Sequence, residues 1–324
     1  MDIRQQITDD IIKALEAPGG LRPWSKSWAS GQLAFNASSG EFYHGVNQFI
    51  LGMQPHTDPR YLTYRQAQYM GLQVREGEHG TRIIKVVEVN RRQAEKEAGD
   101  TGEVLANEGG RSLVLKAYTV FNASQIDGMA PLPARVCDVQ PAEVVEAIVR
   151  GLKDTGMKLH YGGNQPVYRL RSDEIICPAI ADFHSLEDAQ ATILHECAHA
   201  SGHPKRLARL HFDVQRGSPE YAREELRAEL AAAMMTVTVG LPPPGPSMIE
   251  SHASYVASWL EALRRDKGEI FRAAADAQKI CDYLSERALA AVPKPIPQPT
   301  EQATEVADEP AIARKPLRPA MGMG

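Results

Sequence analysis

Two histidines and a glutamate lie at a spacing that suits metal chemistry. Residues 195–199 are His-Glu-Cys-Ala-His, an HExxH motif. Residues four apart share one face of a helix, so His195 and His199 would present two imidazoles to one metal ion. Glu196 would not coordinate; it would act as the catalytic base, taking a proton from the attacking water and passing it to the leaving group. The motif therefore predicts the centre of a metallopeptidase.

A hydrolytic zinc site also needs a third protein ligand, for which three residues are candidates. Glu229 lies inside the apolar stripe of a predicted helix over residues 219–239, and Glu225 lies toward the edge of that stripe. A buried carboxylate needs a cation, and a metal on the facing helix would supply one, so we favour Glu229, then Glu225. His203 comes last, because Gly202 and Pro204 disturb the helix around it. An ion pair between Glu229 and a nearby arginine is the structural alternative.

The elements that must position these residues follow from capping and periodicity. Ser185 is placed as the N-cap of a helix over residues 182–200 that carries the motif, and Gly202 gives a stop signal. A further helix is predicted over residues 141–152. A strand over residues 167–176 precedes the motif and could pair with an extended peptide beside the metal.

The N-terminal part of the chain has its own pattern. We expect a helix at residues 7–15, a loop at 18–40 and a helix at 64–70 that Gly71 ends. The run 81–89 predicts a strand that pairs with 113–121, with 90–110 as its exposed, charged connection. The sequence thus predicts an α+β protein, with a small α+β domain at 1–130, a linker at 131–140, a mainly helical domain with a short sheet at 141–290, and a Pro-rich disordered tail at 291–324.

Composition excludes several classes of protein. The net charge of −5 argues against a histone-like or polybasic membrane-surface protein. The four cysteines are far apart and form no CxxC pair, which disfavours a disulfide framework. The N-terminal residues are polar and acidic, and no run of about 18 apolar residues occurs. We therefore expect a cytoplasmic protein without a membrane partner.

Motifs along nearly the whole chain resemble one family. The segments TILHECAHASGHPKRL (192–207) and YAREELRAELAAA (221–233) are similar to the metallopeptidase domain of ArdC-type plasmid antirestriction proteins. GEFYHGVN (40–47), LTYRQA (62–67), VREGEHGT (74–81) and YTVFN (118–122) are similar to the N-terminal domain of that family, which some plasmid primases share. The resemblance covers all but the tail.

The resemblance implies a domain that binds single-stranded DNA, joined to a zincin-like domain, in a plasmid-encoded protein that shields incoming conjugative DNA from host restriction. It carries over His195, Glu196 and His199, and it does not decide between Glu225 and Glu229. Zn²⁺ is the expected metal, with Mn²⁺ as the alternative. A proteolytic target would be a host protein or a restriction enzyme met on the entering strand.

Local charge supports a DNA-binding N-terminal region. Between residues 22 and 92 there are nine Lys and Arg against five Asp and Glu, and this stretch overlaps the aromatic-rich part of the chain. Proteins that bind single strands combine basic grooves with aromatic stacking platforms. The candidate DNA-binding residues are Trp24, Trp28, Tyr43, Arg22, Lys26, Arg65, Arg75, Arg82 and Lys85. The structural alternative is that most of these aromatics form the core of a small domain.

Two other functions compete with this interpretation. A binding protein could act by coating DNA, with a vestigial metal site. A transfer accessory protein would have no protective role at all.

Overall fold

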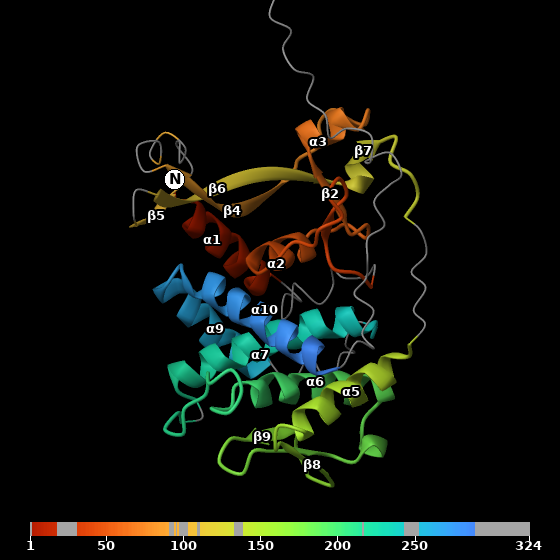
Figure 1. Cartoon of the computed structure of the whole chain (residues 1–324), viewed down its shortest axis with the longest axis vertical. Coiled ribbons are helices and arrows are strands. Elements are labelled where there is room, and N and C mark those ends of the chain that lie inside the picture. Colours follow the sequence, from red (N-terminus) through yellow and green to blue (C-terminus); the bar gives the residue numbers. More distant parts are fainter. Residues whose placement is uncertain are drawn as a thin grey trace, which may run out of the picture.

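The structure is a computed structural model that describes residues 2–17, 31–90, 94, 96, 103–108, 111–132, 139–215, 217–242 and 253–288. Helices and strands both contribute to it, which confirms the predicted α+β class. Figure 1 shows the N-terminal strands at one end of the molecule and the C-terminal helices at the other. The helices α1 (Ile3–Glu16) and α2 (Val46–Gly52) lie between them.

The N-terminal half is built around a sheet whose central strand is β6 (Arg111–Asn122). β4 (Thr81–Asn90) pairs with β6 antiparallel over its whole length, which confirms the predicted pairing. β1 (Phe35–Asn36) and β2 (Arg60–Thr63) complete the order β1-β2-β6-β4, and β5 (Glu103–Glu108) also pairs with β6. The short strands β3 (Gln73–Val74) and β7 (Ile126–Asp127) form a separate pair.

The strand β5 (Glu103–Glu108) corrects the expectation that residues 90–110 form only an exposed connection. It pairs antiparallel with β6, with a register shift between Val104 and Ala106. The sequence did not indicate this strand, because its apolar run is short and an acidic residue lies at each end. Residues 111–115 of β6, which do not pair with β2, supply the backbone hydrogen-bond partners of β5. β5 is therefore a strand because of its tertiary contacts.

The N-terminal helices begin where their caps place them. α1 begins at Ile3, four residues before the predicted start, because the Asp2 carboxylate accepts a hydrogen bond from the backbone N–H of Arg4. One face of α1 is buried, and its residues are Ile3, Ile7, Ile11 and Leu15. α3 (Tyr64–Tyr69) is confirmed, with a capping box between Thr63 and Gln66. Gly71, at φ +71°, follows it.

The C-terminal half is mainly helical, as predicted, with one small sheet. Its strands have the order β8-β10-β9. The predicted strand at 167–176 is in fact two antiparallel strands, because the chain turns back at Asp173, whose φ is +51°. The elements are α5 (Pro141–Lys153), β8 (Lys158–Tyr161), β9 (Val167–Arg169), β10 (Glu174–Cys177), α6 (Leu186–Ser201), α7 (Pro219–Val239), α9 (Ala253–Arg265) and α10 (Glu269–Arg287).

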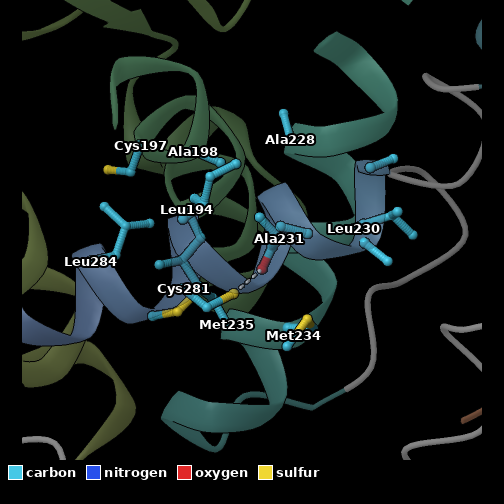
Figure 2. Close-up of a cluster of buried hydrophobic side chains, with 14 of the residues drawn as sticks. Leu194, Cys197, Ala198, Ala228, Leu230, Ala231, Met234, Met235, Cys281 and Leu284 are labelled. Carbon is cyan, nitrogen blue, oxygen red and sulfur yellow. Dashed lines mark hydrogen bonds between the residues drawn. The ribbon is translucent and has the colours of Figure 1, made fainter. Parts of the chain in front are cut away.

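Small side chains allow α6, α7 and α10 to pack closely. Figure 2 shows Ala198 of α6 and Ala228 and Ala231 of α7 among larger apolar side chains such as Leu194 and Leu284. The Sγ of Cys281 on α10 donates a hydrogen bond to the carbonyl oxygen of Ala231, at 3.4 Å. The separate contact between α6 and α7 brings Glu225 and Glu229 of α7 within reach of the motif on α6.

The largest apolar cluster contains residues from both halves of the chain. The buried face of α1 and Phe49 of α2 belong to the same cluster as the residues of α6, α7 and α10. The Thr8 hydroxyl donates to the carbonyl oxygen of Lys267, at 3.0 Å, and Gln278 accepts from the backbone N–H of Gly45. The domain boundary at 131–140 stays a prediction, and an isolated N-terminal fragment would expose the apolar faces of α1 and α2. Most of that linker, and the tail at 291–324, lie outside the described residues.

Among the helices that the structure describes, none combines the length and the apolar character needed to cross a bilayer.

Candidate metal centre

The HExxH motif lies on α6, whose N-cap is Ser185 as predicted, although the helix begins at Leu186 and not at residue 182. The Ser185 hydroxyl accepts a hydrogen bond from the backbone N–H of Asp188 at its N-terminus, and Gly202 is the C-cap residue. His195, Glu196 and His199 are all buried, with exposed fractions of 6%, 5% and 9%. The predicted helix therefore carries all three groups into the interior, where α7 faces them.

The Nε2 atoms of the two histidines and one carboxylate meet at a point. His195 Nε2 and His199 Nε2 are 3.2 Å apart. Glu225 places Oε2 3.6 Å from the first of these atoms and Oε1 3.5 Å from the second. A tetrahedral metal with bonds of about 2.0–2.2 Å separates its ligand atoms by about 3.3–3.6 Å. The three side chains therefore fit Zn²⁺ or a similar divalent ion, and they form a cluster whose ligand atoms all lie within 4.8 Å of one another.

The two favoured candidates for the third ligand differ in the atom that they face. Glu229 Oε2 lies 3.6 Å from Nδ1 of His195, on the opposite side of the ring from Nε2. Glu225, which we ranked second, is the carboxylate that faces Nε2 of both histidines. The geometry thus favours Glu225 over Glu229 as the ligand. The two glutamates share one face of α7, one turn apart, so their spacing alone could not show which turn is level with the histidines.

His203 lies apart from this cluster. It follows the end of α6, where its Nδ1 accepts a hydrogen bond from the backbone N–H of Lys205. Its Nε2 lies 3.9 Å from Asp173, and burial lowers the pKa of this histidine. The break at Gly202 therefore turns its side chain away from the other two imidazoles.

The electrostatics of the cluster match a site for a cation. Burial alone would lower the pKa of His195, but hydrogen bonds with Glu225 and Glu229 outweigh it and raise that pKa to about 9. Burial works against the charge of Glu225 as well, yet the two imidazoles hold its pKa far below the usual range. The buried carboxylate of Glu225 is therefore ionised and needs positive charge nearby, which a divalent cation would supply in exchange for protons.

Glu196 has the environment of a general base. Burial raises the pKa of its carboxyl group, which brings it closer to the range useful for proton transfer at neutral pH. The backbone N–H of Tyr168, on β9, faces this carboxylate and favours its charged form, which opposes the effect of burial. β9 is an edge strand of its sheet, so this base lies beside backbone groups that could also bind an extended peptide.

The candidate DNA-binding residues that the structure describes lie apart from one another, on different elements. Tyr43 packs against the core, in a T-shaped contact with Tyr61, and burial raises its pKa to about 12, so it belongs to the core. Arg75 pairs with Glu78 and Asp127. Trp24, Trp28, Arg22 and Lys26 lie outside the described residues.

The remaining basic candidates are exposed on different elements. Arg65 lies on α3, whereas Arg82 and Lys85 lie on β4, three residues apart and therefore on opposite faces of that strand. Arg82 donates a hydrogen bond to the side chain of Gln6. They form no single basic patch.

Two exposed tyrosines on α3 were not among the DNA-binding residues predicted from the sequence. Tyr64 and Tyr69 have exposed fractions of 43% and 64%, and Arg65 lies between them in the chain. The short helical pattern gave no sign of their exposure, because only the packing of Ala67 into the core shows which face of α3 is outward.

Family comparisons divide the chain into two matching regions. A family described as the N-terminal domain of anti-restriction factor ArdC matches residues 1–121. A family described as a zincin-like metallopeptidase matches residues 144–276, which contain the motif and α7.

Solved structures match nearly the whole chain. The metal-free crystal structure of antirestriction protein ArdC from the R388 plasmid is 34% identical, with a TM-score of 0.70, and the match covers 89% of this chain and 98% of that one. The Mn(II)-bound structure of the same protein is 33% identical, with a TM-score of 0.69, and covers 90% and 99%.

Relatives occur as separate proteins and as parts of longer ones. The uncharacterized protein y4eC of Sinorhizobium fredii is 36% identical over 289 residues, which are 87% of this chain and 91% of that protein. A DNA primase TraC of Escherichia coli is 37% identical over 297 residues, which are 86% of this chain. The chain spans only 27% of that primase.

Proposed function

Because the chain belongs to the ArdC family of antirestriction proteins, we propose that it is a plasmid-encoded, cytoplasmic protein that binds single-stranded DNA and protects incoming conjugative DNA from restriction. We infer that its C-terminal half is a metal-dependent peptidase. The observation that carries this second part is the convergence of His195, His199 and Glu225 beside the buried Glu196.

Each residue of the centre would have a distinct role. His195, His199 and Glu225 would hold Zn²⁺ or Mn²⁺, which supplies a Lewis acid that activates water and polarises a peptide carbonyl. Glu196 would take the proton from the attacking water and deliver it to the leaving nitrogen. The outer edge of β9 would hold the peptide in an extended form, so that the bond to be cleaved lies next to this base.

The test of the peptidase uses Glu196→Gln, which keeps the shape of the side chain but cannot accept the proton. We expect this variant to bind Zn²⁺ like the parent and to lose cleavage of unfolded protein substrates, assayed by gel and mass spectrometry with Zn²⁺ or Mn²⁺ added. Equal cleavage by both proteins would refute the role of Glu196.

DNA binding requires a separate test on the full chain, because α1 and α2 share their apolar cluster with the C-terminal helices. Fluorescence anisotropy at two salt concentrations should show salt-sensitive binding to single strands that exceeds binding to duplexes, since phosphate contacts release counterions. Absence of binding to either form would remove this part of the proposal.

The match to part of a TraC primase favours a second candidate, a transfer accessory protein whose metal centre takes no part in catalysis. The two functions differ in vivo. Protection of an incoming plasmid that Glu196→Gln leaves unchanged would favour binding without catalysis. If deleting the gene changes transfer but not restriction of the entering plasmid, the accessory role would be favoured.

A further inference from the structure

A largely buried arginine outside the motif reaches the metal centre through one carboxylate. Arg209, in the segment between α6 and α7, makes two parallel hydrogen bonds to Glu224: Nε to Oε2 and Nη2 to Oε1, both at 2.8 Å. Its Nη2 also donates to the carbonyl oxygen of Ala198, at 2.9 Å. The guanidinium therefore ties the first turns of α7 to the backbone of α6 beside His199.

The carboxylate that Arg209 holds contacts the imidazole of His199. Glu224 Oε1 lies 3.2 Å from Nδ1 of His199. Both side chains are buried, with exposed fractions of 8% for Glu224 and 9% for His199. A carboxylate at Nδ1 keeps the proton on that nitrogen, which leaves the lone pair of Nε2 directed at the point where Glu225 and His195 meet.

The two neighbouring glutamates thus act on opposite nitrogens of one ring. Glu225 faces Nε2 of His199 at 3.5 Å, and Glu224 faces Nδ1. A glutamate side chain has several rotamers, and a buried one without a fixed cation could turn toward other donors. The planar guanidinium removes this freedom, because its paired donors match both oxygens of the carboxylate.

We propose that Arg209 is a positioning residue of the metal centre, which orients the ring of His199 and selects its Nδ1–H tautomer by holding Glu224. This inference rests on the proposed function, because it assumes that His199 binds a metal through Nε2. It assigns the centre a residue that lies ten positions beyond the HExxH motif. Loss of such an outer partner typically lowers metal affinity by about 10–100-fold.

The simpler alternative is that Arg209 and Glu224 only join two helices. A matched control separates the two explanations. Arg227 lies on α7, as Glu224 does, and donates hydrogen bonds to Glu269 at 2.7 Å and to Asp276 at 2.8 Å. Its side chain is 12% exposed, against 14% for Arg209. Arg227→Gln therefore removes a comparable buried pair that contacts neither histidine of the motif.

The experiment measures the Zn²⁺ affinity of the full chain by competition with a chromophoric chelator, and the unfolding free energy of the metal-free protein in urea. Arg209→Gln and Glu224→Ala should each lower the affinity by about 10–100-fold. Arg227→Gln should leave the affinity within about twofold, although it also destabilises the fold. Glu224→Gln and Arg209→Lys, which keep size or charge, should fall between the parent and the stronger variants.

A spectroscopic measurement reports the tautomer directly. In the Zn²⁺-saturated parent, the Nδ1 proton of His199 should give a slowly exchanging downfield NMR signal, which Glu224→Ala abolishes and Arg227→Gln retains. Parent-like affinity in folded Arg209→Gln would overturn the proposal, as would an equal loss in Arg227→Gln. If the parent itself binds no Zn²⁺, the proposed metal centre fails first, which is a different outcome.

Discussion

Glu229 lies 3.6 Å from Nδ1 of His195, the ring nitrogen on the side opposite the point where the two motif histidines meet. This position suits a carboxylate that orients a ligand from outside the metal sphere. Glu225, one turn earlier on α7, faces Nε2 of the same histidine. The two glutamates therefore suit different roles, Glu225 that of a metal ligand and Glu229 that of a residue that orients His195.

That division predicts unequal effects on metal binding. Glu225→Ala should lower Zn²⁺ affinity by more than about 100-fold, because it would remove a proposed ligand, whereas Glu229→Ala should lower it by about 10–100-fold. Isothermal titration of both variants, compared with the parent, checks the order. If Glu229→Ala causes the larger loss, then Glu229 is the ligand.

Because α5 and α10 pack closely at Gly151, replacing this glycine with alanine should destabilise the protein. In most helices Gly→Ala stabilises by about 1 kcal/mol. Here a Cβ at residue 151 of α5 would lie 2.3 Å from the carbonyl oxygen of Arg287, on α10, so backbone must move. Gly151→Ala should instead lower the unfolding free energy by about 1–3 kcal/mol, measured in urea. The exposed neighbour Arg150→Ala, a control on the same helix, should change it by less than about 0.5 kcal/mol.

A buried ion pair near β9 predicts a pH-dependent stability. Burial would raise the pKa of Asp173, but hydrogen bonds from Arg206 and Tyr168 outweigh it and lower that pKa below its ordinary value. A lowered folded-state pKa means stability that is fully present above the unfolded pKa and is lost as the pH falls through the folded pKa. The contribution of this pair should therefore begin to fall near pH 4 and continue to fall below it.

Asp173→Asn tests this directly, because asparagine tolerates the positive φ at this position. The variant should be less stable by about 3–5 kcal/mol at pH 7, since it leaves the buried Arg206 without its counter-ion. Urea titrations at pH 7, 5, 4 and 3.5 should show the difference between parent and variant shrinking as the pH falls. A constant difference across this range would contradict the assignment.

If the chain binds single-stranded DNA as proposed, we expect the exposed tyrosines of α3 to stack on its bases. Tyr64→Ala and Tyr69→Ala should each weaken binding of single strands, at about 1–3 kcal/mol per stacked base. Arg65→Gln should reduce the salt dependence of binding as well. Tyr43→Phe serves as the control, since its ring packs against the core. Anisotropy with a labelled oligonucleotide measures all four, and a larger effect at Tyr43 than at α3 would place the contact elsewhere.

The sequence by itself determined the parts of this protein that depend on local spacing. The ends of α6 were predictable from the N-cap at Ser185 and the stop signal at Gly202. The HExxH motif predicted that the two imidazoles are neighbours, because residues four apart lie on the same face of a helix. The pairing of β4 with β6 was predictable for a similar reason, because a run rich in β-branched residues and a second run of apolar and aromatic residues are both typical of strands, which need partners.

Only the tertiary structure decided which residues of distant segments meet. The offset between α6 and α7 sets Glu225 level with the Nε2 atoms, and that offset depends on small residues such as Ala198 and Ala231 in the contact between helices. The edge of β6 made a strand of β5, and the shared apolar cluster joined α1 to the C-terminal helices. Such outcomes depend on how whole surfaces pack, and the order of residues within one segment does not contain that information.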